Sequence, residues 1–131
     1  MINDIKANPD KYFAIYAPAN LQELKKIIHN ATKYLGNEGN YNWIDVSWVT
    51  SFNRLFYNMS EWNGDITKWN TSNLVNMLST FEGALAFNRD LSGWDVSNIK
   101  YISAVTFKNC CPELIACFKA KKYPKKITNF S

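Results

Sequence analysis

The strongest constraint on the fold of this chain is a sequence motif that occurs twice. "WNGDITKWNTSN" begins at residue 62, and "FNRDLSGWDVSN" begins 25 positions later, at residue 87. A repeat of this length usually marks structural units that must stack, because no single unit can bury its apolar face alone. We therefore expect the matching positions to face the neighbouring copy.

The alignment extends to about two and a half copies. Trp69 matches Trp94, and we predict that both are core residues of adjacent copies. Asp65 matches Asp90, and we interpret this pair as part of the scaffold. Phe107 falls one position later than the spacing requires, which predicts a one-residue insertion in the third copy.

Each copy contains two kinds of local pattern. In residues 72–83 the apolar residues follow the i, i+3, i+4, i+7 spacing of one helical face, with Ser72 placed as an N-cap and Gly83 as a stop. The segment "FNRDLSGWDVS" instead predicts a short extended stretch and a turn, in which polar side chains hold backbone amides. We therefore predict an α+β solenoid, a leucine-rich-repeat-like stack of coils with helical caps at both ends.

The predicted caps flank the repeats. Residues 20–36 form an amphipathic pattern with Asn20 as N-cap and Gly36 just past the end, and His29 on the outer face. Residues 12–18 precede it as an edge strand, and Pro112 begins a second capping helix that Pro124 stops. We expect one domain, residues 1–131, comprising an N-terminal part (1–40), the repeats (41–109) and a C-terminal cap with a basic tail (110–131).

The net charge of +4 is concentrated near the C-terminus, where six lysines and one glutamate follow position 107. The simplest interpretation of this tail is a solvated end. The alternative is contact with nucleic acid or an acidic partner. The residues that would make such contact are Lys119, Lys121, Lys122, Lys125 and Lys126.

The sequence gives little indication of export, membrane insertion or bound metal. The first residues lack a basic start and a continuous apolar run, so we expect a cytoplasmic protein, or a cell-surface protein if a leader was removed. No segment approaches the ~18 apolar residues of a membrane span. We expect Cys110, Cys111 and Cys117 to be free thiols, and we expect no cofactor and no zinc site. Calcium binding by the Asn-x-Asp rows is a weaker alternative.

The segments "FNRDLSGWDVSNIKYISAVTF", "WNGDITKWNTSNLVNMLSTF" and "IDVSWVTSFNRLF" together resemble the BspA-like leucine-rich repeat proteins. Their motif is also found in mycoplasma surface proteins. The resemblance covers roughly residues 20 to 107. It implies a repeat scaffold without enzymatic activity, in a family whose members bind host proteins and are secreted or lipid-anchored.

Acid–base catalysis by Asp65 and Asp90 is disfavoured, because equivalent repeat positions give two carboxyl groups similar surroundings, whereas an acid and a base need different ones. The leading hypothesis is a non-enzymatic protein-binding module, either a small inhibitor or adaptor or a fragment of a surface adhesin. Its specificity should come from columns in which the copies differ, and from residue types common at binding hot spots. The predicted partner-binding residues are Trp48, Arg54, Tyr57, Tyr101 and Arg89.

Trp48 has two competing interpretations. It stands where the other copies have Asn73 and Asn98, so it is unnecessary for the coil and available to a partner. Alternatively, it lies under the N-terminal helix and seals the first coil.

Overall fold

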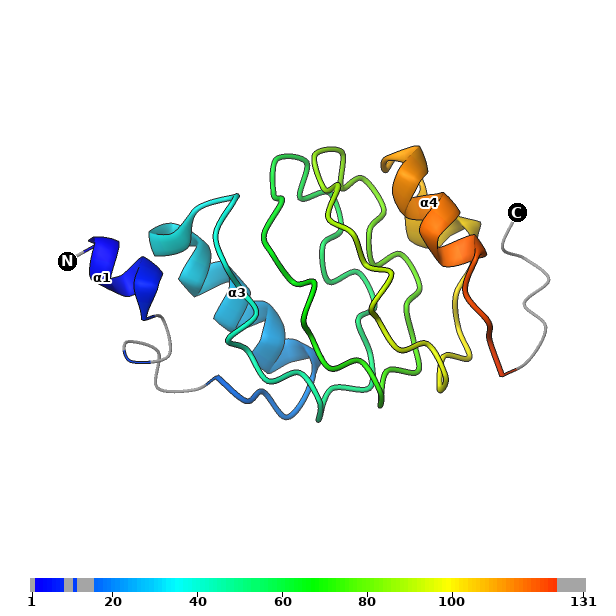
Figure 1. The fold of residues 1–131 in the computed structure, drawn as a ribbon, viewed down its shortest axis with the longest axis horizontal. Helices are drawn as coiled ribbons and strands as arrows, with labels where there is room; N and C mark the ends of the chain where they lie inside the picture. Colours follow the sequence, from blue (N-terminus) through cyan, green and yellow to red (C-terminus); the bar gives the residue numbers. More distant parts are fainter. Residues whose placement is uncertain (1, 9–10, 12–15, 125–131) are drawn as a thin grey trace.

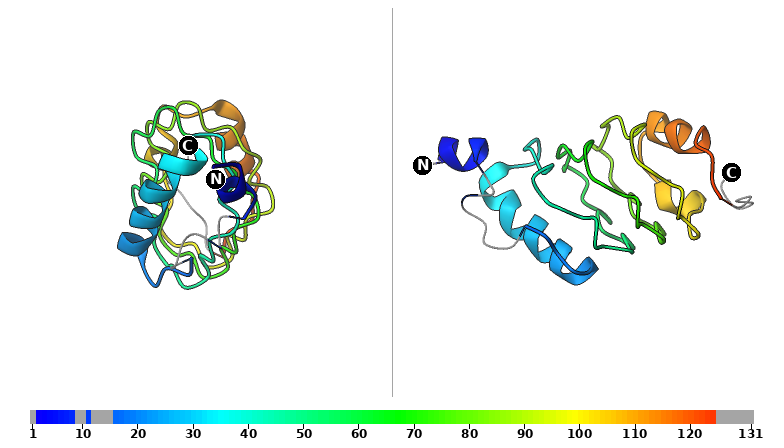
Figure 2. Two further views of the ribbon diagram at one scale, coloured as in Figure 1. Left: turned by 90° about the vertical axis from the view of Figure 1, so that its left-hand side faces the viewer. Right: turned by 60° about the horizontal axis from the view of Figure 1, so that its bottom comes forward.

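The computed structural model describes residues 2–8, 11 and 16–124. The middle of the chain winds into coils that lie side by side, with helix α3 at one end of the row and helix α4 at the other (Figure 1). Seen along the row, the coils superimpose in an oval outline (Figure 2). Three isolated parallel bridges join equivalent positions of neighbouring coils: Asn40 with Asp65, Ser51 with Asn76, and Asn76 with Tyr101.

The predicted α+β solenoid of leucine-rich repeats is wrong. The described part of the chain contains no named strand and no sheet, and pairing between coils is limited to isolated bridges. The predicted helix over residues 72–83 is absent, because that segment consists of turns with one bridge residue. The only helical segment inside the repeats is the short 3-10 helix η1, Ala104–Phe107.

The helix prediction failed because tight turns produce a similar apolar spacing. The amide of Leu74 donates to the carbonyl of Thr71, and the amide of Thr80 donates to the carbonyl of Met77. Such i to i+3 bonds bring every third residue to the core face. Ser79 then has a positive φ of 57°, which interrupts any right-handed helix. The Asn76 side chain also accepts from the Leu78 amide, and this local bond competes with helix formation.

The core is built from rows of aromatic rings that run across the coils. The rings of Trp69 and Trp94 stack with centroids 6.1 Å apart, and both residues are nearly inaccessible, at 4% and 3% exposure. Trp62 stacks on Phe87 at 6.0 Å. The prediction that the two tryptophans are core residues of adjacent copies is confirmed.

The same tryptophans also tie one coil to the next. The indole nitrogen of Trp69 donates to the carbonyl of Tyr41, and that of Trp94 donates to the carbonyl of Ile66. In each case the acceptor lies in the preceding coil. A phenylalanine would be smaller and would leave the buried carbonyl without this donor.

The one-residue insertion in the third copy is confirmed by the hydrogen-bond register. The carbonyl of Tyr101 accepts from Met77, 24 residues earlier, whereas that of Thr106 accepts from Phe81, 25 residues earlier. The register therefore changes by one residue between positions 101 and 106, where η1 lies. Phe107 still stacks on Phe81, with centroids 6.2 Å apart.

Helix α3, Leu21–Leu35, closes the first coil as predicted. The Asn20 side chain accepts from the Glu23 amide, and Gly36 follows the last residue with a φ of 74°. His29 is exposed. A shorter helix that the sequence did not indicate, α1 (Ile2–Ala7), packs on α3. The residues of α3 buried in the core are Leu24, Ile28, Ala31 and Leu35.

The predicted edge strand at 12–18 falls mainly on residues 12–15, which lie outside the described residues. Of its remaining positions, Tyr16 forms no strand, and its carbonyl accepts from the Asp45 amide at 2.7 Å. This bond attaches the segment before α3 to the first coil.

Helix α4, Pro112–Lys119, closes the last coil, with Pro112 in its first turn as predicted. Phe118 is fully buried and lies edge-on against Trp94, with ring centroids 6.2 Å apart. Beyond the helix, the Tyr123 hydroxyl donates to the carbonyl of Phe118. Among the described residues, no helix is both long and apolar enough to span a membrane.

Candidate functional site

The exposed aromatic residues of the repeats gather on one side of the coils. We name segments 48–58, 73–83 and 98–109 the aromatic side, and segments 37–47, 59–72 and 84–97 the acidic side. Trp48 is 70% exposed and Tyr101 is 54% exposed. The exposed large hydrophobic residues of the aromatic side are Trp48, Tyr57, Tyr101 and Val105.

The exposure of Trp48 excludes the interpretation in which α3 covers it. The reason for its difference from the other copies lies in the same column. The side-chain amide of Asn73 donates to the carbonyl of Ser47, and that of Asn98 donates to the carbonyl of Ser72. Each asparagine thus holds the preceding coil. Trp48 belongs to the first coil, where no preceding repeat supplies an acceptor, so the stack places no such demand on it.

Arg54 and Tyr57 form a local pair on the first coil. The guanidinium carbon of Arg54 lies 5.1 Å from the centre of the Tyr57 ring, a distance at which a cation and an aromatic face attract. Arg54 has a positive φ of 58°. It also lines a shallow hollow of about 440 Å³ between the aromatic side and α3, whose other lining residues are Leu21, Gln22, Lys25, Asn53, Leu78 and Ser79.

Tyr101 extends this surface to the third coil. Its backbone pairs with Asn76, which in turn pairs with Ser51, so that one row of positions crosses all three coils. Val105, 48% exposed, lies in η1, where the chain accommodates its extra residue. Four of the five predicted partner-binding residues therefore fall in the stacked segments that make up the aromatic side.

Arg89, the fifth predicted residue, lies on the acidic side and is engaged within the protein. Its Nε donates to the carbonyl of Asn63 at 3.0 Å, and its guanidinium lies 3.2 Å from a carboxylate oxygen of Glu38. The Asn63 side-chain amide also donates to Asn88, and the Asn88 amide donates back to Asn63. Arg89 thus connects three successive parts of the stack.

The predicted basic contact near the C-terminus is only partly described. Lys119 and Lys122 are exposed. Lys121 donates to the carbonyls of Ser92 and Trp94, both at 2.9 Å, and so holds the cap on the third coil. Lys125 and Lys126 lie outside the described residues.

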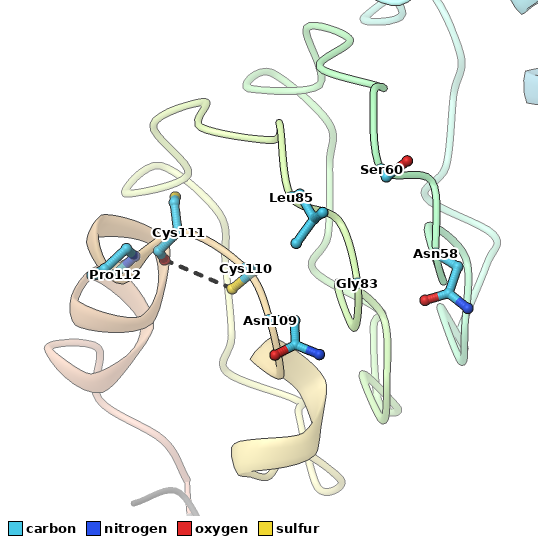
Figure 3. Close-up of a pocket in the computed structure, with 8 residues that line it drawn as sticks. All are labelled: Asn58, Ser60, Gly83, Leu85, Asn109, Cys110, Cys111 and Pro112. Atoms are coloured by element: carbon cyan, nitrogen blue, oxygen red, sulfur yellow. Dashed lines mark hydrogen bonds between the residues drawn. The ribbon is translucent and has the colours of Figure 1, made fainter.

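A groove of about 740 Å³ crosses the coils where the aromatic side turns into the acidic side. Figure 3 shows Asn58 at the end of the first coil, Gly83 at the end of the second with Leu85 just after it, and Asn109 beside Cys110 and the start of α4. Asn58, Gly83 and Asn109 all have positive φ, of 56°, 76° and 61°. The side-chain oxygen of Asn58 lies where a Cβ on Gly83 would be.

Sequence reasoning did not identify this groove, although a signal was present. Gly83 stands between two asparagines in its column, and its missing side chain leaves room for the Asn58 carboxamide. Leu85, 62% exposed, supplies an apolar wall. Cys110 lies on the same rim, where burial, with a smaller contribution from Cys111, raises the pKa of its thiol to about 12. A thiol with this pKa is a poor nucleophile at neutral pH.

Charge also differs between the two sides. The aromatic side carries Arg54, Lys100 and Lys108 against one acid, Glu82. The acidic side carries Lys68 and Arg89 against six acids: Glu38, Asp45, Glu61, Asp65, Asp90 and Asp95.

The aspartates of the acidic side accept hydrogen bonds within their own turns. Asp65 accepts from both the amide and the hydroxyl of Thr67, and Asp90 accepts from the amide of Ser92. Burial tends to raise the pKa of Asp65, but the bonds from Thr67 and Asn42 and the charge of Arg89 together lower it. The bonds from Ser92 lower the pKa of Asp90. Both carboxylates are therefore stabilised in the same ionised form, which gives no acid–base pair.

Within the described residues, no cluster of three or more histidine, cysteine, aspartate or glutamate side chains could hold a metal ion. The three cysteines are free thiols in this structure.

Comparison with known proteins identifies the scaffold. Neither the curated proteins nor the solved structures include a match. One family model matches residues 17–112, which include α3, all the coils and the first residue of α4. Because this match spans well over half of the chain, the protein belongs to the family described as Mycoplasma protein of unknown function, DUF285.

Proposed function

We propose that this protein is a non-enzymatic module that binds a partner protein through its aromatic side. The observation that carries the proposal is Trp48, which is 70% exposed at a position where the stack needs no tryptophan. Exposing an indole to water is unfavourable unless a partner covers it. Tryptophan, tyrosine and arginine are also the residue types that most often dominate binding energy.

The extent of the surface supports the same proposal. Trp48, Arg54 and Tyr57 lie on the first coil and Tyr101 on the third, with the second coil between them. The groove continues this surface, since Asn58 follows Tyr57 directly. The resemblance of the repeats to BspA-like proteins, whose members bind host proteins, favours a binding role over catalysis. The protein acts as a small inhibitor or adaptor in this proposal, and a surface adhesin fragment is the alternative.

Affinity capture with matched variants tests the proposal. The full chain, Trp48→Asn, Tyr101→Asn and a control, Glu61→Gln on the acidic side, are immobilised and exposed to the same cell lysate. Trp48→Asn restores the residue of the other copies, so its melting temperature should equal that of the parent. We expect a protein retained by the parent and by the control to be lost with both aromatic variants.

Retention of the same proteins by Trp48→Asn and Tyr101→Asn would contradict the proposal. A large drop in the melting temperature of Trp48→Asn would also contradict it, because the indole would then serve the fold. Fractionation of the native cells separates the two versions: a soluble intracellular pool favours the inhibitor or adaptor, and a surface pool favours the adhesin.

A further inference from the structure

We infer that the partner segment that binds the aromatic side is acidic, and that it carries a basic or neutral residue opposite Glu82. This inference rests on the proposed function and specifies its partner. The two sides of the coils differ in charge, with three basic residues and one acid on the aromatic side and two basic residues and six acids on the other. A surface of this kind attracts a partner of opposite charge.

The charges form an ordered row across the coils. The Asn58 amide donates to the carbonyl of Glu82, and the Gly83 amide donates to the carbonyl of Lys108. Tyr57, Glu82 and Lys108 therefore occupy equivalent positions on successive coils, which neighbour one another at about 4.8 Å. Because Arg54 lies over the Tyr57 ring, the row is positive, negative and positive.

The side chains of this row are available to a partner. Arg54 and Lys108 are exposed, and Glu82 is half-buried. Lys100, also exposed, adds a further positive charge next to Tyr101. The lysine that binds the protein's own carbonyls, Lys121, lies on the cap and takes no part in this row.

The alternation favours a protein segment over a nucleic acid. A duplex carries one phosphate per ~1.7 Å of its axis, and a single strand is also charged at every nucleotide. A backbone laid along the row would therefore place phosphates against Glu82. A peptide can instead place carboxylates opposite Arg54 and Lys108 and leave a basic or neutral residue between them.

Fluorescence anisotropy at low salt tests the inference with defined probes. These are labelled peptides of equal length in which tyrosine alternates with glutamate, with glutamine or with lysine, and an oligothymidylate of the same length. We expect the glutamate peptide to bind about tenfold more tightly than the glutamine peptide, and its binding to weaken as salt is added.

Charge-changing variants test whether each side chain strengthens or weakens binding of the glutamate peptide. Lys108→Glu and Lys100→Glu should each weaken binding of the glutamate peptide by about fivefold. Glu82→Lys should strengthen it by a similar factor. The matched control is Lys68→Glu, which makes the same charge change on the acidic side and should leave binding unchanged.

Several outcomes would overturn the inference. The first three are equal binding of the glutamate and glutamine peptides, no effect of Lys108→Glu, and no binding of any peptide. The fourth is that the oligothymidylate binds more tightly than the peptides and that Lys108→Glu and Lys100→Glu weaken its binding. If the glutamine peptide binds as well as the glutamate peptide and Trp48→Asn abolishes both, the acidic specificity fails while the proposed function stands.

Discussion

The aromatic and acidic sides of the coils are held together in different ways. On the aromatic side, neighbouring coils are joined mainly through the backbone, as where the Phe52 amide donates to Asn76 and the Phe56 amide donates to Thr80. On the acidic side, the second and third coils are joined mainly through side chains, including Asn63 with Asn88 and the Trp94 indole with Ile66.

This difference explains where the copies agree. A backbone bond is indifferent to the side chain of its residue, so the aromatic side can vary without loosening the stack. A bond made by an indole or a carboxamide requires that residue type. Two matching columns that bond between coils, Trp69 with Trp94 and Asn63 with Asn88, lie on the acidic side. A third, Asn73 with Asn98, lies at the edge of the aromatic side. Trp48 and Tyr101, which differ from their counterparts in the other copies, lie on the aromatic side.

The largest effect is expected when one tryptophan on each side is replaced by alanine. Trp94→Ala should destabilise the protein by about 3–5 kcal/mol, because it removes a buried ring and leaves the Ile66 carbonyl without its donor. Trp48→Ala should change stability by less than about 0.5 kcal/mol, as expected for an exposed residue. Thermal melting of the two variants measures both effects, and equal losses would remove the distinction between the sides.

A smaller effect is expected from one arginine on each side. Arg89→Met removes the donor to the Asn63 carbonyl and the contact with Glu38, and should cost about 1 kcal/mol. Arg54→Met removes only an exposed cation–π contact and should cost about 0.5 kcal/mol or less. Urea denaturation of both variants gives the comparison. A larger loss for Arg54→Met would show that the aromatic side also depends on its side chains.

The smallest effect is a dependence on pH that arises on the acidic side. Hydrogen bonds from Ser47 and Ser97 lower the pKa of Asp45 and Asp95, and the pKa values of Asp65 and Asp90 are lowered as well. A carboxyl group whose pKa is lower in the folded state contributes stability above its unfolded pKa, near 4, and loses it as pH falls through the folded value. We therefore expect the urea concentration at the unfolding midpoint to decrease when the pH is lowered below about 4.

The control replaces these four aspartates by asparagine. Asn70 already forms the same turn in this protein, since its side chain accepts from the Ser72 amide. The fourfold variant should therefore fold, and its urea midpoint should vary less between pH 5 and pH 3 than that of the parent. An unchanged pH profile would show that the turn aspartates do not control acid stability.

The sequence predicted the features that depend on exact repetition or on local signals. The 25-residue spacing identified Trp69 and Trp94 as neighbours, and the displaced Phe107 located the insertion. Asn20 and Gly36 marked the ends of α3 because both act on the nearest turn of the chain.

Other features required knowledge of the third dimension. Tight turns and a helical face give similar apolar spacing, so the turns around Met77 were interpreted as helix. Arg89 differs from its counterpart Gly64, and sequence alone could not tell that its guanidinium reaches the carbonyl of Asn63. The groove beside Gly83 depends on the positions of Asn58 and Asn109 relative to it, which the alignment shows only as a column.

The 3-10 helix η1 has a consequence for how this chain can be lengthened. An extra residue between two inner coils would displace every later layer, whereas the one between positions 101 and 106 lies in the last repeat, and Phe107 regains its partner directly afterwards. Val105, within η1, is exposed. The stack thus already accommodates one extra residue at this position. A short epitope or a fluorescent reporter is therefore best inserted in this loop, where the stacking of the other coils is preserved.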